Sequence, residues 1–152
     1  MELILWRHAE AESGDPDDAR PLTAKGHKQA AKMADWLDRN LPSRCRIFVS
    51  PARRTLQTAE ALGRKFKVDT GIGPNASAEA ILRLAQWPHS REPVLIVGHQ
   101  PTLGQVAGLL IAGSSQNWSI RKANVWWITR KDVDGAAANY VRAVVAPDLL
   151  IR

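Results

Sequence analysis

The stretch LILWRHA, residues 3–9, is a short apolar run that ends abruptly in an arginine and a histidine. An uninterrupted apolar run such as Leu3–Trp6 is typical of a strand that is buried on both faces of a sheet. Two further runs of this kind follow later in the chain, Arg46–Val49 and Val94–Val97. We therefore expect these three segments to be parallel neighbours in one sheet.

Helical patterns occupy the chain between the three strands. Ser50 and Pro51 together are typical of a helix start, with serine as the N-cap and proline at the first helical position. The other helices are indicated by apolar residues at helical spacing and by glycine, asparagine or proline stops. The four expected helices are one opened by Thr23 and stopped at Asn40, one from Ser50 that carries Phe66, one around Ala78–Trp87, and one from Pro101 stopped by Gly113.

The C-terminal part has a different pattern. Val125–Thr129 and Asn139–Val145 flank the turn signal Asp134-Gly135, which predicts a hairpin at the edge of the sheet. Strands that alternate with helices predict an α/β fold. We expect a three-layer sandwich, with a mostly parallel central sheet, helices on both faces and C-terminal edge strands. The 152 residues fit a single domain with one core.

Composition points to an ordinary globular protein, with 45% hydrophobic and 24% charged residues. The single cysteine, Cys45, cannot form an internal disulfide, which favours a reducing cytoplasm. The apolar run near the N-terminus is too short for a signal peptide or a membrane span. The net charge is +6, but the basic residues are scattered. We expect a cytoplasmic monomer that binds neither a membrane nor nucleic acid.

Side chains that suit an anion follow the three expected strands. Arg7 and His8 follow the first strand, Arg53 and Arg54 lie just beyond the second, and His99 follows the third. Ligands of open α/β sheets bind outside the carboxyl ends of the strands. Two of the expected helices begin at this edge and add positive N-terminal ends, and no carboxylate sits directly at these strand ends. The sequence therefore predicts a site for a dianion such as phosphate.

Four motifs, in this order, resemble those of the histidine phosphatase superfamily, also called the phosphoglycerate mutase-like fold. The short length and the segment Arg20–Gly26 are similar to the SixA-type phosphohistidine phosphatases within it. The resemblance spans residues 1–104. Its motifs are Arg7-His8-Ala9, the segment Arg20–Gly26, the pattern formed by Ser50, Arg54 and Thr58, and Gly98-His99.

This resemblance implies a role for each site residue. His8 would be the nucleophile that takes a phosphoryl group from the substrate and passes it to water. Arg7, Arg54 and His99 would hold the phosphoryl oxygens, a task that suits the planar fork of arginine. Arg53 competes with Arg54 for this role, but it points about 100° away around the helix. The motif spacing of the family selects Arg54.

No metal or other cofactor is expected. The chain has four histidines, but no pair of them shows a metal-ligand spacing. Carboxylates are also absent from the ends of the motifs. His27 and His89 lie in polar contexts and are expected at the surface.

The sequence offers no convincing general acid. Larger family members use an acidic residue from an inserted segment, which short members lack. Glu79, near the start of a helix, is the best candidate here, but a solvated first-turn acid explains it more simply. A missing acid favours a substrate with an easy leaving group, such as phosphohistidine on a protein. A phosphatase for a small phosphorylated metabolite and a non-catalytic module that binds phosphate or a polyanion stay open as alternatives.

Overall fold

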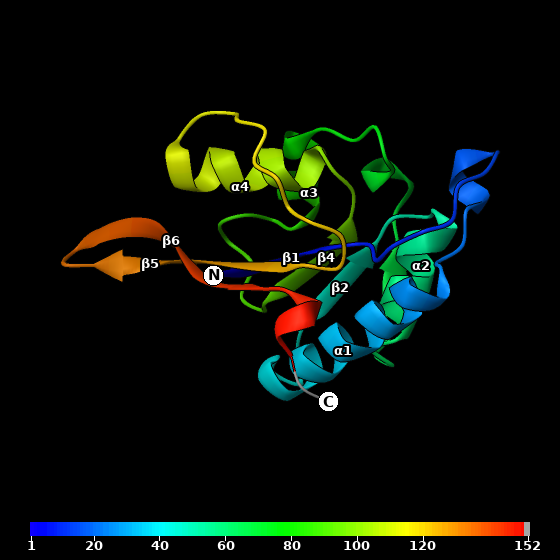
Figure 1. The fold of residues 1–152 in the computed structure, drawn as a ribbon. Coiled ribbons are helices and arrows are strands. Elements are labelled where there is room, and N and C mark those ends of the chain that lie inside the picture. Colours follow the sequence, from blue (N-terminus) through cyan, green and yellow to red (C-terminus); the bar gives the residue numbers. More distant parts are fainter. Residues whose placement is uncertain (151–152) are drawn as a thin grey trace.

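The computed structural model describes residues 1–150 and has one six-stranded sheet, in the order β3-β2-β4-β1-β5-β6 (Figure 1). No helix in this described part of the chain is long and apolar enough to cross a membrane. The elements are β1 (Glu2–Arg7), η1 (Asp17–Ala19), α1 (Ala24–Asn40), β2 (Arg46–Val49), α2 (Arg53–Glu60), β3 (Lys67–Val68), η2 (Thr70–Ile72), α3 (Ala78–Leu84), β4 (Val94–Gly98), α4 (Thr102–Ala112), β5 (Val125–Val133), β6 (Ala136–Val145) and η3 (Pro147–Leu149), where η marks a 3₁₀ helix.

The three apolar runs form the parallel centre of the sheet, as predicted. Strand β4 pairs in parallel with β1 on one side and with β2 on the other. The expected C-terminal hairpin is also present, because β5 pairs antiparallel with both β1 and β6. Its turn residues Asp134 and Gly135 have φ values of 51° and 82°. Positive φ at both positions is what a tight two-residue hairpin turn requires.

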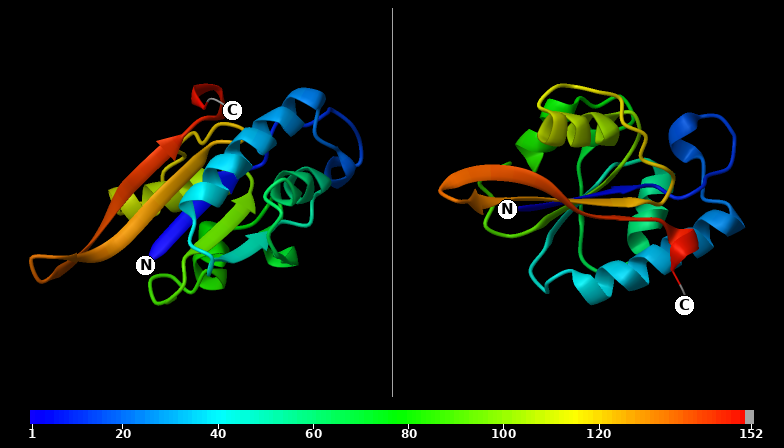
Figure 2. Two further views of the ribbon diagram at one scale, coloured as in Figure 1. Left: turned by 90° about the horizontal axis from the view of Figure 1, so that it is seen from below. Right: turned by 60° about the vertical axis from the view of Figure 1, so that its left-hand side comes forward.

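Each face of the sheet carries its own core. Helices α1 and α2 cover one face, and α3 and α4 cover the other (Figure 2). Alternate residues of β1 point to opposite sides, so Ile4 packs with Leu37 of α1 while Leu5 packs with Leu103 of α4. This arrangement confirms the predicted α/β three-layer sandwich with a mostly parallel sheet and C-terminal edge strands.

The helix predicted from Ser50 to Phe66 was wrong at both ends. Helix α2 begins at Arg53, and its N-cap position is Ala52. Ser50 does not cap it, because the Ser50 hydroxyl lies 2.7 Å from a ring nitrogen of His99. The helix stops at Glu60, and the chain then turns at a glycine with a φ of 72°, Gly63. The short strand β3, which follows this turn, was not predicted from the sequence.

The start of α1 fixes the loop that follows β1. Thr23 caps the helix by accepting a hydrogen bond from the Gly26 amide at 2.9 Å, and its own hydroxyl donates to the Glu10 carboxylate at 2.8 Å. The helix approaches the loop so closely at Gly26 that a Cβ atom there would clash with the Glu10 carbonyl. The loop after β1 is therefore held directly against the first turn of α1.

Candidate active site

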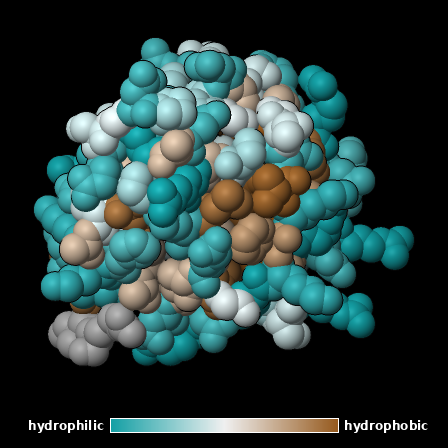
Figure 3. Space-filling model, turned by 90° about the vertical axis from the view of Figure 1, so that its right-hand side faces the viewer, coloured by the Kyte–Doolittle hydropathy of each residue, from teal (hydrophilic) through white to brown (hydrophobic). Residues whose placement is uncertain are grey.

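The carboxyl ends of the central strands bring two histidines together. His8 follows β1 and His99 follows β4, and their ring centroids lie 5.4 Å apart. Both side chains are buried. Figure 3 looks onto this end of the molecule, where hydrophilic side chains surround a hydrophobic patch. The structure thus places His8 and His99 side by side, at the sheet edge where the sequence led us to expect an anion site.

The surroundings of His8 determine its tautomer. Its Nδ1 lies 2.7 Å from the Ala9 carbonyl oxygen. A carbonyl oxygen only accepts hydrogen bonds, so Nδ1 carries the ring proton and the lone pair is on Nε2. Burial, together with the positive charges of Arg7 and Arg54, lowers the pKa of His8 to about 4, although the bond to Ala9 acts in the opposite direction. The ring is therefore neutral at neutral pH.

The backbone on both sides of His8 is also fixed. The His8 amide donates to the Gly98 carbonyl at 3.1 Å, and the His8 carbonyl accepts from the Ala123 amide at 3.0 Å. The Ala9 amide donates to the Thr58 hydroxyl at 3.0 Å, and that hydroxyl in turn donates to the α2 backbone. The position of the His8 ring is consequently set by β4, by α2 and by the segment that precedes β5.

Arg54 is the arginine that α2 directs inward. It is only 3% exposed, whereas the neighbouring Arg53 is exposed. Arg54 donates from Nη1 to the Asp17 carbonyl at 2.9 Å and from Nη2 to the Asp17 carboxylate at 3.0 Å. Its Nε is buried and has no hydrogen-bond partner within residues 1–150.

Arg7 places a second guanidinium beside His8. Its Nη1 donates to the Ile120 carbonyl at 3.0 Å, while its buried Nε makes no hydrogen bond to the described residues. Burial and the positive charge of Arg54 lower the pKa of Arg7, which reflects the closeness of the two guanidinium groups. Two arginines with unpartnered buried donors form an environment that favours an oxyanion.

His99 is also neutral. Its Nε2 lies 2.7 Å from the Ser50 hydroxyl, and its buried Nδ1 has no partner among residues 1–150. Burial and the positive charge of Arg54 lower the pKa of His99 to about 3, although the negative charge of Asp17 raises it. The positive charge of this site at neutral pH therefore comes from the arginines.

A family model described as the histidine phosphatase superfamily (branch 1) matches residues 3–75. A phosphohistidine phosphatase SixA homolog from Haemophilus influenzae is 32% identical over 126 residues, which cover 72% of this chain and 77% of that protein. The chain belongs to the histidine phosphatase superfamily.

Other relatives agree with this assignment. Phosphohistidine phosphatase SixA from Escherichia coli is 28% identical over 125 residues, which cover 76% of this chain and 77% of that protein. The solved structure of the protein histidine phosphatase SixA in complex with tungstate superposes with a TM-score of 0.77 at 22% identity, covering 98% of this chain and 99% of the other. The predicted fold and the predicted phosphatase class are thus confirmed.

Two polar groups at the site of this histidine phosphatase were not predicted. The sequence indicates Ser50 only as a helix cap and a motif residue, and no motif or spacing draws Asp17 into the expected site. Partial burial raises the pKa of Asp17, but hydrogen bonds from Arg20 and Arg54 outweigh it and the net direction is downward. The signal that could have revealed Asp17 is the acidic segment Asp15–Asp18, in the loop that follows the first family motif.

The remaining candidates lie away from this histidine phosphatase site or at the surface. Glu79 is exposed in the first turn of α3, which is the simpler of the two interpretations given above. His27 and His89 are both exposed, as predicted. Within residues 1–150, no three His, Cys, Asp or Glu side chains are grouped so that they could hold a metal ion.

Proposed function

We propose that this histidine phosphatase hydrolyses phosphohistidine on a protein, through a covalent phosphohistidine intermediate on His8. The hydrogen bond from His8 Nδ1 to the Ala9 carbonyl carries the proposal. It supports a neutral ring whose Nε2 lone pair is available to attack phosphorus. Burial of the ring keeps it in this form by lowering its pKa.

The first step transfers the phosphoryl group to His8. A bond forms between His8 Nε2 and phosphorus while the P–N bond of the substrate breaks, and its electron pair stays on the substrate imidazole, which takes a proton from water. The phosphorylated ring keeps its Nδ1 proton on the Ala9 carbonyl. Arg7, Arg54 and His99 hold the three phosphoryl oxygens, where the negative charge of the transition state lies.

The second step releases phosphate. A water molecule attacks phosphorus, the bond to His8 Nε2 breaks, and the electron pair returns to that nitrogen. The water gives up a proton as inorganic phosphate forms. The same oxygen-holding groups serve both steps, because both transition states carry negative charge on the same oxygens.

The ionisation and position of the nearby carboxyl groups favour phosphohistidine over phosphoserine as the substrate. A serine alkoxide is a poor leaving group and normally needs a proton from a nearby acid. The lowered pKa of Asp17 favours its ionised form, which is a poor proton donor, and Glu79 is exposed on α3. An imidazole leaves without such help. Relatives named phosphohistidine phosphatase support the same choice.

The domain organisation, location, oligomeric state and metal requirement of the enzyme form a second part of the proposal. We infer a single domain over residues 1–152 that acts in the cytoplasm as a monomer and needs no metal ion. One sheet shared by both cores supports the single domain. Burial raises the pKa of the single cysteine, Cys45, to about 11, which supports a thiol that stays reduced and unreactive.

The test is to trap the intermediate. The protein is mixed with a phosphohistidine peptide that carries radiolabelled phosphate, and the reaction is quenched after a few milliseconds. We expect an acid-labile, base-stable label on the protein, which His8→Ala abolishes together with turnover. His27→Ala, a change at an exposed histidine, is the matched control and keeps both.

Substrate choice is measured on paired peptides that carry phosphohistidine or phosphoserine at the same position. We expect kcat/KM to be at least about 100-fold higher for phosphohistidine, the size that general acid catalysis typically supplies. Comparable values would contradict the proposed substrate, as would a large loss of activity in Glu79→Gln. Tight phosphate binding without hydrolysis of either peptide, or of an aryl phosphate, would indicate a non-catalytic module.

A further inference from the structure

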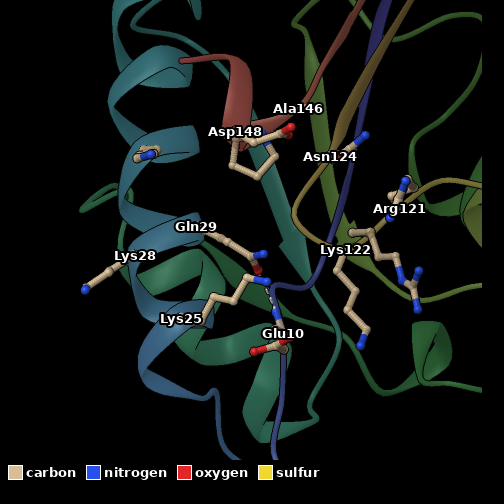
Figure 4. A pocket seen from close by; sticks show the side chains of 12 residues that line it. Glu10, Lys25, Lys28, Gln29, Arg121, Lys122, Asn124, Ala146 and Asp148 are labelled. Carbon is tan, nitrogen blue, oxygen red and sulfur yellow. Dashed lines mark hydrogen bonds between the residues drawn. The ribbon is translucent and has the colours of Figure 1, made fainter. Parts of the chain in front are cut away.

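A pocket of about 780 Å³ lies beside the proposed phosphoryl site, between α1 and the loop that precedes β5 (Figure 4). We call it the basic pocket. Two carboxylates, of Glu10 and Asp148, also belong to its lining. The basic side chains that line it are those of Arg7, Lys25, Lys28, Lys32, Arg121 and Lys122.

Two separate segments supply these charges. Lys25, Lys28 and Lys32 recur at a spacing that places them along one side of α1. Arg121 and Lys122 come from the opposite wall, far away in sequence. In Figure 4, Lys25 and Lys122 extend from these two walls toward the space between them. The fold therefore gathers this positive charge, although the sequence showed no long basic block.

The charge of the basic pocket is largely uncompensated inside the protein. None of the five ion pairs formed within residues 1–150 includes a lysine or an arginine of this lining. The Glu10 carboxylate accepts a hydrogen bond from Thr23. Lys25, Lys28 and Lys122 are exposed. The pocket thus presents a positive field to solvent, which attracts negatively charged partners.

The pocket adjoins the proposed phosphoryl site. Arg7 belongs to both. The Arg7 amide donates to the carbonyl of Asn124, a lining residue, at 3.2 Å, and the Ala123 amide next to it donates to the His8 carbonyl at 3.0 Å. The basic pocket and the proposed phosphoryl site are consequently neighbours that share the Arg7 side chain.

We propose that the basic pocket binds acidic side chains that flank the phosphohistidine of a protein substrate. This inference rests on the proposed function, since such a substrate brings its neighbouring surface against the pocket when its phosphohistidine reaches His8. The lining favours carboxylates in variable positions, because four of its six cations are lysines, which are flexible point charges without a fixed fork. None of the lining residues is aromatic, so the bases of a nucleic acid would have no surface on which to stack.

The proposal is tested with two phosphohistidine peptides that differ only in flanking charge. One carries four glutamates around the phosphohistidine, and the other carries four glutamines. We expect the wild-type protein to hydrolyse the acidic peptide with about tenfold higher kcat/KM at low salt, because several exposed charge pairs each contribute a few-fold. The preference should fall toward unity at about 0.5 M salt, where the Debye length is only a few ångströms.

Charge-reversal variants test whether the preference for the acidic peptide arises in the basic pocket. In the double variant Lys25→Glu with Lys122→Glu, we expect the preference for the acidic peptide to be lost while the neutral peptide is still hydrolysed. The matched control reverses two exposed lysines near the opposite edge of the sheet, Lys65→Glu with Lys67→Glu, and has the same net charge. This control should keep most of the preference.

The outcomes separate this proposal from the proposed function. Equal hydrolysis of both peptides by the wild type would overturn the docking role alone. The docking role is also overturned if both double variants lose the preference for the acidic peptide equally. It is overturned as well if long polyphosphate or duplex DNA binds the basic pocket while the two peptides are hydrolysed equally. If the wild type hydrolyses an aryl phosphate but neither peptide, the phosphohistidine substrate itself is wrong, and the docking role is overturned with it.

Discussion

His8 and His99 differ in what their ring nitrogens contact, although both rings are buried and neutral. Nδ1 of His8 is bonded to a carbonyl oxygen, which can only accept. Nε2 of His99 faces the Ser50 hydroxyl, which can donate or accept. The proton position on His8 is therefore fixed by the backbone, while His99 can change tautomer as its hydroxyl partner rotates. This difference suits a nucleophile and an oxygen-holding group, respectively.

The first residue-scale prediction concerns pH. A histidine whose pKa is about 4 in the folded protein stays in its nucleophilic neutral form as the pH falls from 7 to about 5. Protonation of His8 should reduce the rate only below that range. We expect kcat/KM for an aryl phosphate, corrected for ionisation of the substrate, to be level from pH 7 to about 5.5 and to decline around pH 4. A decline with a midpoint near 6.5, the ordinary histidine value, would contradict this environment for His8.

A second residue-scale prediction uses the neighbouring arginines of α2 as a matched pair. Removing one donor to a developing oxyanion typically costs about 3 kcal/mol in the barrier, which is about 100-fold in rate. Arg54→Ala should therefore lower kcat/KM by about this factor. Arg53→Ala, at an exposed position one residue away, should change it less than about twofold. If the Arg53 variant shows the larger loss, the register assigned to the second motif is wrong.

At the scale of elements, α1 and the loop after β1 meet at a point where only glycine fits. The first turn of α1 lies against the Glu10 carbonyl at Gly26. The same loop continues to Asp17, which bonds to Arg54 of α2. Packing at Gly26 therefore positions the start of the loop that carries Asp17. This gives a physical reason for a glycine at the end of the Arg20–Gly26 motif.

This contact leads to a prediction about stability. In an exposed helix, replacing glycine by alanine stabilises by about 1 kcal/mol. At Gly26 the added methyl group would meet backbone atoms, and overpacking of that kind costs about 1–3 kcal/mol or more. We expect Gly26→Ala to lower the free energy of unfolding by about 2 kcal/mol, as measured by urea denaturation.

Gly73→Ala is the control for this measurement. Gly73 has ordinary negative φ, and a Cβ atom there would have no neighbour within 4 Å. Its replacement should be neutral or should stabilise by a few tenths of a kcal/mol, since it reduces the freedom of the unfolded chain. Equal effects at the two positions would show that backbone entropy, and not the contact with Glu10, governs Gly26.

Elements differ in how well the sequence predicted them, for identifiable reasons. The central strands were predicted correctly because both of their faces are buried, which produces uninterrupted apolar runs. The start of α2 was wrong because the sequence does not reveal that the Ser50 hydroxyl lies against His99 instead of capping the helix. Its end was also wrong, because Leu62 and Phe66 contact the core from irregular chain and so imitate a helical pattern.

On the scale of the whole molecule, the sequence predicted which strand ends meet but not what the tail contributes. His8, Arg54 and His99 converge because parallel strands end at one edge. The segment before β5 carried no usable motif, yet Ile120 accepts a hydrogen bond from Arg7, and the Ala123 carbonyl accepts one from the Trp6 indole at 3.1 Å. Hydrogen bonds to backbone groups do not depend on residue type, so sequence patterns cannot reveal them.

A prediction for the whole protein concerns metal ions. Two arginines supply the positive charge of the proposed phosphoryl site, and in the proposed mechanism His8 is the nucleophile, without help from a metal-bound water. We therefore expect dialysis against a chelator such as EDTA to leave kcat for an aryl phosphate unchanged within about 20%, which is an allowance for assay error. Loss of a group that takes part in catalysis would have a much larger effect, since removing one oxyanion donor costs about 100-fold in rate. Loss of activity that added Mg²⁺ or Zn²⁺ restores would contradict metal independence.

The hydrogen bond between Ala123 and His8 links assembly of the site to the order in which the chain is synthesised. The two residues are 115 positions apart, so the surroundings of His8 are completed only after the segment before β5 has been synthesised. A nascent chain that has emerged only through α4 already carries His8, Arg54 and His99. It still lacks the Ile120 carbonyl that accepts from Arg7, the Ala123 amide that donates to the His8 carbonyl, and one wall of the basic pocket. Phosphatase activity should therefore require the segment before β5, and a chain truncated before residue 120 would carry every predicted site residue without an assembled site.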